Sequence, residues 1–166
     1  MKECVISDVQ VMLELGHDDD SDLDLVLKTE SIPLELTPGG VIGGAGTIGG
    51  FGISVKEATR AENVVYWPPV SIRDPDRREI INKATREALR TAEGLGVSSV
   101  GLFTMGLEVS RIPSWEVAEE IVKGVVTHLK EQTALERIFL VASSPMQVSS
   151  FEYVLLNHSI VTSEEE

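Results

Sequence analysis

Eight of the 14 glycines in this 166-residue chain lie in one short stretch, TPGGVIGGAGTIGGFG, residues 37–52. A backbone can approach a phosphate closely only where side chains are absent, and its N–H groups then donate to the phosphate oxygens. The stretch lacks the Gly-Lys-Ser/Thr of a Walker A loop and contains no clean Gly-x-Gly-x-x-Gly pattern. Two interpretations stay open: a cradle for a phosphate-bearing ligand, or a tight backbone passage without a ligand.

A second candidate is the acidic stretch GHDDDSD, residues 16–22, whose carboxylates could supply oxygen ligands to a hard cation. The glycine and the distal glutamate of a calcium-binding loop are not at the required positions. His17 beside the aspartates could ligate a transition metal, but a single histidine on a loop indicates this only weakly. We expect a solvated turn and assign no metal ligand, with a specific metal site as the alternative.

The net charge of −13 argues against nucleic-acid binding, which needs a cationic surface to displace counterions. Six basic residues nevertheless fall near one predicted helix: Arg73, Arg77, Arg78, Lys83, Arg86 and Arg90. They could form a local basic patch. We favour a solvated helix face on which they pair with acidic residues three or four positions away.

The remaining composition is that of an ordinary globular domain, with 42% hydrophobic and 25% charged residues. No apolar run approaches the ~20 residues of a membrane span, and the first residues contain no signal-peptide core. The single cysteine, Cys4, fits a reducing compartment and is expected to be a small core residue. We therefore expect a cytoplasmic protein without a membrane partner.

The first half of the chain contains two stretches with period-two alternation, residues 5–15 and 23–28, which is typical of half-buried strands. We expect them to form an N-terminal β-hairpin with the acidic stretch at its tip. In the first stretch the inward-facing residues are expected to be Val9, Val11, Leu13 and Leu15. A buried strand follows at residues 63–70 and ends at Pro68-Pro69.

The second half alternates strands and helices. Asp74 and Pro75 are the expected cap and first residue of a helix that ends at Gly94 or Gly96. Its buried stripe is expected to be Ile80, Ile81, Ala84, Ala88, Leu89, Ala92 and Leu95. A strand at 97–103, a helix capped by Ser114, a strand at 137–142 and a last helix capped by Ser149 or Ser150 follow. This order predicts an α/β fold with a mixed central sheet and helices on both faces.

Ligands of open α/β sheets bind outside the carboxyl ends of the strands. Three segments lie there: the glycine stretch, the loop 104–113 and the loop 143–148. We expect them to meet at one edge of the sheet.

The order and pattern of residues 63–142 resemble the macro domain, and the resemblance extends more loosely over about 38–156. It rests on the strand NVVYWPPV, the helix DPDRREIINKATREALRTAEGLG, the strand VSSVGLF, the Ile112-Pro113 loop end, the helix SWEVAEEIVKGVVTHLKE and the strand LERIFLVASS. The helix AEEIVKGV is also similar to the macro-like N-terminal domain of leucine aminopeptidases. The resemblance implies a three-layer fold and a cleft for ADP-ribose between the glycine loop and the loop after the second of these strands.

The resemblance also implies a set of ligand-binding residues. These are Gly39, Gly40, Val41, Gly43, Gly44, Gly46, Phe103, Thr104, Gly106, Glu108, Arg111 and Ser143. Thr104 stands where the family has proline, and Leu107 to Arg111 replace a glycine-rich diphosphate loop. Glu108 would repel a diphosphate at short range, and Arg111 could offset this repulsion. The Asn-Ala-Ala-Asn motif of the family's hydrolases is missing, because the first asparagine is Asn63.

Three functions remain open. The first is binding of ADP-ribose or a related nucleotide diphosphate, with Phe103 or Phe151 near the adenine or distal ribose unless both belong to the core. The second is hydrolysis of ADP-ribosyl phosphoesters or esters (Appr-1''-p processing), for which Asp74 and Glu108 are the only acids on the expected edge and no catalytic residue is assigned.

The third is a non-catalytic scaffold that has lost the ligand. Its homo-oligomer would form through the exposed strand edge of the hairpin. Trp67 and Trp115 could anchor such a contact, although burial in the core is the expectation for both. No cofactor is implied. We expect a single domain over residues 1–160 and an acidic tail over 161–166.

Overall fold

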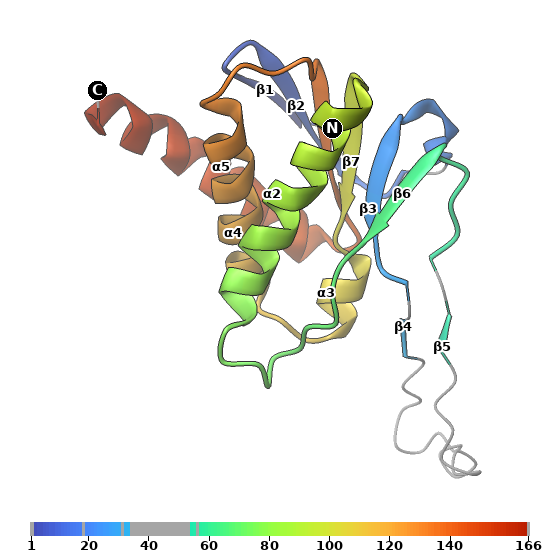
Figure 1. Ribbon diagram of the computed structural model, residues 1–166. Helices are drawn as coiled ribbons and strands as arrows, with labels where there is room; N and C mark the ends of the chain where they lie inside the picture. Colours follow the sequence, from blue (N-terminus) through green and yellow to red (C-terminus); the bar gives the residue numbers. More distant parts are fainter. Residues whose placement is uncertain (1, 18, 31, 34–53, 56, 166) are drawn as a thin grey trace, which may run out of the picture.

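The computed structural model describes residues 2–17, 19–30, 32–33, 54–55 and 57–165. A six-stranded mixed sheet runs in the order β1 (Lys2–Ile6), β2 (Val9–Leu15), β8 (Arg137–Ala142), β7 (Ser99–Phe103), β3 (Leu25–Lys28) and β6 (Asn63–Tyr66) (Figure 1). Neighbouring strands are parallel except β1, which is antiparallel to β2. The short strands β4 (Ile32–Pro33) and β5 (Ser54–Val55) form a separate antiparallel pair.

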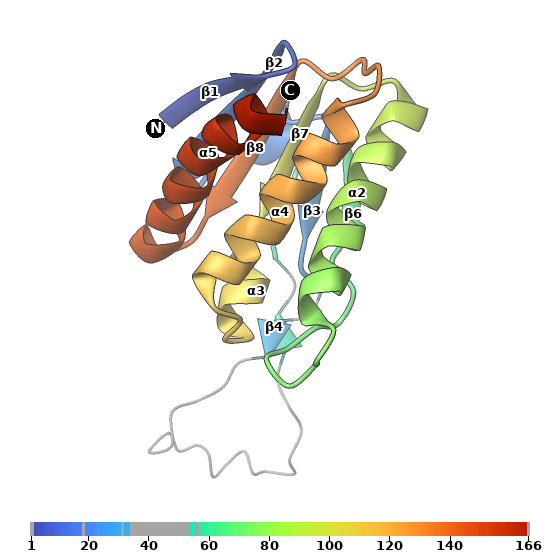
Figure 2. The ribbon, with the colours of Figure 1, turned by 90° about the vertical axis from the view of Figure 1, so that its left-hand side faces the viewer.

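Three long helices lie side by side on one face of the sheet: α2 (Arg77–Leu95), α4 (Ser114–Leu129) and α5 (Pro145–Glu165) (Figures 1 and 2). The short helix α3 (Met105–Val109) follows β7 directly, and a 3-10 turn, η1, spans Asp20–Asp22. Among the described residues, no helix combines the length and apolar character that a bilayer crossing requires. The architecture is the expected α/β fold with a mixed sheet.

The core forms where the helical stripes meet the central strands. All five residues of β7 are buried, as expected of a parallel strand covered on both sides. In α2 the predicted stripe is buried from Ile81 to Ala92, while Leu95 at the helix end is exposed. Gly96 then ends α2 in the left-handed conformation that favours glycine.

The second face of the sheet carries a smaller apolar cluster made of Leu23, Val26, Phe103, Phe139 and Val141. The partly buried Ala61, from the segment that leads into β6, packs against this cluster. A helix on this face, which the sequence predicts, is not found among the described residues. The predicted glycine cradle at 37–52 lies outside the described residues.

The N-terminal hairpin is present, but its partners differ from the prediction. β1 pairs with β2 through a turn at Ser7 and Asp8, both with positive φ angles of 50° and 68°. The stretch 23–28, expected to pair with 5–15, instead contributes β3 between β7 and β6. The acidic stretch therefore crosses from one part of the sheet to another, and Leu15 at its start is exposed.

Several predicted boundaries of helices and loops were wrong. The caps of α2 and α4 are Asp76 and Pro113, and half of the expected loop 104–113 forms α3. α5 begins at Pro145, four residues before the expected cap, because Ser144 accepts the amide of Gln147 in a capping arrangement. It continues through Glu165, across most of the expected tail.

Candidate functional site

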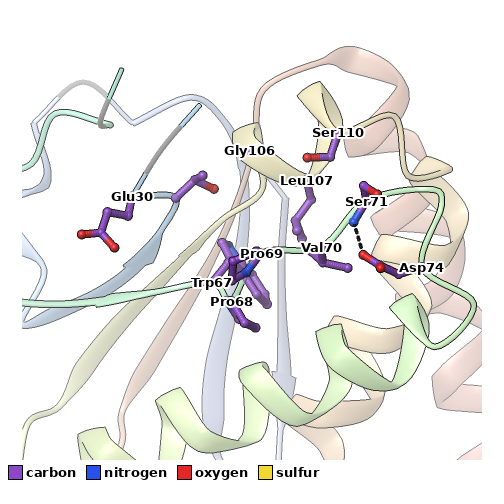
Figure 3. Close-up of a pocket in the computed structure, with 11 residues that line it drawn as sticks. Glu30, Trp67, Pro68, Pro69, Val70, Ser71, Asp74, Gly106, Leu107 and Ser110 are labelled. Carbon is purple, nitrogen blue, oxygen red and sulfur yellow. Dashed lines mark hydrogen bonds between the residues drawn. The ribbon is translucent and has the colours of Figure 1, made fainter. Parts of the chain in front are cut away.

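A cavity of about 630 Å³ opens at the carboxyl ends of β3 and β6, beside α3 (Figure 3). This is the edge at which ligands of open α/β sheets bind, and the volume is within the range of small-molecule sites. Its lining consists of Thr29, Glu30, Trp67, Pro68, Pro69, Val70, Ser71, Asp74, Gly106, Leu107 and Ser110. This described lining includes two acidic residues and no basic residue.

Trp67 forms the inner wall of the cavity at the end of β6. Its backbone amide donates to the Lys28 carbonyl at 2.8 Å, and its indole Nε1 donates to the Phe103 carbonyl at 2.8 Å. These bonds join three neighbouring strand ends. Pro68 and Pro69 lack the amides that would continue the ladder, so the chain leaves the sheet here and forms the cavity rim.

The rim is held by Asp74, whose Oδ2 accepts the Ser71 amide at 2.8 Å (Figure 3). Asp74 was predicted to be a helix cap, and in the structure it closes the turn that precedes α2. Asp74 is one of two acids in the described cavity lining, with Glu30.

Gly106 forms the opposite wall at its closest approach to β3. A Cβ atom at this position would lie 1.7 Å from the Thr29 hydroxyl oxygen, so only glycine fits without displacing Thr29. The Thr29 hydroxyl is buried and has no hydrogen-bond partner within the described part of the chain. It is therefore a polar group at the cavity that a ligand could satisfy.

Glu108 does not line the cavity. Its carboxylate accepts the Thr104 hydroxyl at 2.6 Å, the Ser143 amide at 2.9 Å and the Ser144 hydroxyl at 2.6 Å. These donors place the negative charge at the N-terminus of α5, where the helix dipole stabilises it. The expected repulsion of a ligand diphosphate by Glu108 is thus reduced, because the carboxylate is bonded elsewhere.

The structure brings the predicted site residues together only in part. Thr104, Glu108 and Ser143 share one hydrogen-bond network, and Gly106 lines the cavity. The Phe103 ring belongs to the core cluster, and Arg111 has a left-handed backbone, with φ 66°, after α3. The glycines from Gly39 to Gly46, with Val41, lie outside the described residues. The assignment of all these residues to a ligand stays a prediction.

Thr29, Trp67 and Ser110 line the cavity but were not among the predicted site residues. The Pro68-Pro69 break after a buried strand marks the end of a strand at the ligand edge, and it could have indicated Trp67. No sequence signal identifies Thr29, because its role depends on contact with Gly106, 77 positions later.

Beside the cavity, Lys28, Asp20 and Glu57 form a buried charged cluster, which we call the clasp. Lys28 Nζ lies 2.9 Å from Asp20 Oδ2, donates to the Ala58 carbonyl at 2.5 Å and lies 4.3 Å from the centre of the Phe103 ring. Glu57 accepts the Thr29 amide at 2.6 Å. The clasp joins the residues before 30–56 to those that follow this range.

The clasp shifts the titration of both acids. Burial alone would raise the pKa of Asp20, but bonds from Lys28, the Arg60 amide and the Thr59 hydroxyl lower it from 3.8 to about 2. Burial raises the pKa of Glu57, against the opposing effects of the Thr29 amide and Lys28. Asp20 is therefore the acid that holds the buried lysine charge.

His17 lies between Glu14 and Asp22, with each ring nitrogen 2.9 Å from a carboxylate oxygen. Burial lowers its pKa, but the hydrogen bonds to Asp22 and Glu14 outweigh this effect and raise it above 6.5. The ring also packs edge-on against Phe103 and Phe139. No group of three or more His, Cys, Asp or Glu side chains able to hold a metal ion occurs among the described residues.

The basic residues of α2 mostly pair across helices. Arg77 forms two bonds to Glu116, at 2.8 and 3.0 Å, and Arg78 bonds Glu119 and Glu120 on α4. The predicted pairing within the helix is seen for Lys83 with Glu87. Trp115, expected in the core, is half exposed and lies under the Arg78 guanidinium.

No protein-family model matches the chain, and no curated protein sequence matches it. Solved structures do match. A macrodomain variant of Oceanobacillus iheyensis with ADPR is 15% identical, with a TM-score of 0.68, covering 94% of this chain and 97% of that one. The same organism's macrodomain with ADP is 17% identical, with a TM-score of 0.66 and coverages of 94% and 95%.

A Trypanosoma brucei macrodomain in complex with ADP-ribose is 19% identical, with a TM-score of 0.59, covering 87% of this chain and 68% of that one. These similarities extend over nearly the whole described sheet and its helices. The chain has the macrodomain fold, as the resemblance in its second half predicts.

Proposed function

We propose that this chain binds ADP-ribose or a related nucleotide diphosphate in the cavity between β3, β6 and α3. The observation that carries the proposal is the place of the cavity: it opens at the ligand edge of a macrodomain fold. Structures with this fold contain ADPR, ADP or ADP-ribose according to their descriptions.

The described walls suit the uncharged parts of such a ligand. Trp67, Pro69, Val70 and Leu107 supply apolar surface. The Thr29 hydroxyl supplies a polar group that has no hydrogen-bond partner among the described residues. Ligand hydroxyl groups could donate to Asp74. Because the described lining contains no basic side chain, we assign the diphosphate to the predicted backbone amides of Gly39 to Gly46.

The test is calorimetric titration of the protein with ADP-ribose, ADP and AMP. Ser110→Trp, which places a large side chain at the cavity wall, should weaken ADP-ribose binding at least about tenfold. Val109→Trp is the matched control, because Val109 is its neighbour on α3, is exposed and lies outside the lining. Absence of heat with all three nucleotides at millimolar concentration, or equal effects of the two variants, would rule out binding in this cavity.

A further inference from the structure

The most exposed large apolar side chains of the described residues are all on α5. Met146, Tyr153 and Leu156 are 72%, 70% and 71% exposed. Their spacing of seven and three residues places them on one side of the helix. The opposite side also carries apolar residues, since Phe151 is fully buried and Val154 packs against the core. A helix that is apolar on both sides is normally covered on both sides.

α5 also departs from the other helices. It has 21 residues, whereas α4 has 16, and its C-terminal half leaves the helix layer and projects from the body (Figures 1 and 2). Tyr153 and Leu156 lie near the middle of α5, where the rest of the chain leaves them exposed.

A groove of about 760 Å³ lies beside this ridge, between α4, α5 and the β1–β2 turn. Ile6, Val122, Val126 and Val154 give it an apolar surface, and Tyr153 belongs to both the groove and the ridge. The ridge and a groove of suitable character are thus adjacent on the same helix pair.

The charges around the groove favour a second copy of the chain as the occupant. The chain has a net charge of −13, which opposes self-association over most of its surface. The groove lining contains Lys123, which lies 3.7 Å from Glu120, and Lys130. Its one acid, Glu119, is paired with Arg78. Two copies that meet here avoid most of the repulsion between their acidic surfaces.

We propose that the chain forms a two-fold homodimer in which the Tyr153–Leu156 ridge of each copy lies in the α4–α5 groove of the other. A two-fold contact requires one surface that carries both complementary features, because each residue that contacts a partner position is itself contacted by its equivalent. This surface has both features. The cavity at the opposite functional edge, lined from β3, β6 and α3, stays open in the dimer.

Light scattering coupled to size exclusion, together with sedimentation equilibrium, tests the proposal. The wild-type protein should show twice the monomer mass of 18.1 kDa, and dimerisation should strengthen with salt as repulsion is screened. Leu156→Lys should weaken dimerisation at least about 30-fold, and Tyr153→Ala should act in the same direction. Both residues are about 70% exposed, so the variants should keep the wild-type circular dichroism and melting temperature.

Val5→Lys is the matched control, because Val5 is 63% exposed but lies on β1, outside the groove lining. It should leave the dimer intact. A monomer at all concentrations up to about 0.5 mM would overturn the proposal. So would a dimer that Val5→Lys dissociates and Leu156→Lys does not, since the contact would then lie along the β1 edge.

Discussion

The clasp yields the sharpest prediction on stability, through Asp20→Asn. Asp20 is 4% exposed and is the carboxylate closest to the buried Lys28 ammonium, at 2.9 Å. Asparagine keeps the shape, and its single acceptor oxygen can still accept the Arg60 amide. Its NH2 group then replaces Oδ2 opposite Lys28 and the Thr59 hydroxyl, and the negative charge is lost. Lys28 is then left buried, with Glu57 as the remaining acid of the clasp.

The magnitude follows from the lowered pKa of Asp20. A decrease from 3.8 to about 2 contributes about 2–3 kcal/mol to the free energy of unfolding at neutral pH. We expect Asp20→Asn to cost about 2–4 kcal/mol at pH 7, the upper value including the unpaired lysine. A depressed pKa gives stability that is present above the unfolded value of 3.8 and is lost as the pH falls through the folded value. At pH 3 the pKa-linked part should fall to about 1 kcal/mol.

The assay is urea unfolding of wild type and variant at pH 7 and pH 3, compared as a difference so that other carboxylates cancel. Glu62→Gln, at an exposed position near β6, should change stability by less than about 0.5 kcal/mol. In a double-mutant cycle, Asp20→Asn with Lys28→Met should cost at least about 1 kcal/mol less than the sum of the single changes. An equal loss at both pH values, or additive single changes, would refute the assigned role of Asp20.

Two further predictions concern packing and histidine titration. Gly106→Ala should destabilise the fold by about 1–3 kcal/mol in urea unfolding, because the added Cβ would collide with Thr29. Gly94→Ala, on α2 with open space around it, should instead stabilise the fold by about 0.5–1 kcal/mol. A change of the same sign in both variants would contradict the contact between Gly106 and Thr29. His17→Gln should reduce the free energy of unfolding more at pH 6 than at pH 9. The raised pKa of His17 gives stability that is complete below the unfolded pKa of 6.5 and is lost as the pH rises through the folded pKa. A loss that does not depend on pH would show that the charged form of the ring does not stabilise the fold.

The helices and central strands of this fold were predictable because their signals are local. The apolar stripes of α2 and α4 bury residues such as Ile81 and Ile121, and Gly96 ends α2 where the sequence indicates. The start of α5 was also predictable, because Ser144, Pro145 and Gln147 have the spacing of a helix start. The expected cap at Ser149 or Ser150 was therefore wrong.

Strand partners were not predictable in the same way. Alternation identified 5–15 and 23–28 as strands, although the turn at Ser7 and Asp8 divides the first of them. It does not say which strand lies beside which. A hairpin was the simplest assumption for neighbours in sequence, whereas β2 pairs with β8 and β3 pairs with β6 and β7. The clasp was hidden for a related reason, because Asp20 and Lys28 meet Glu57 only after the chain has returned from the segment between them.

α3 decides how a nucleotide diphosphate could be held. The resemblance to the macro domain implies that backbone amides after β7 bind the diphosphate, but here the later amides donate within the segment: Glu108 to Thr104, Ser110 to Gly106, Arg111 to Glu108 and Ile112 to Leu107. An amide that already has a carbonyl acceptor is a poor donor to a phosphate. The N-terminus of α5 could also bind an anion, but the Glu108 carboxylate already accepts hydrogen bonds there. These observations support the proposal that the glycine stretch binds the diphosphate, and the difference in affinity between ADP and AMP tests it.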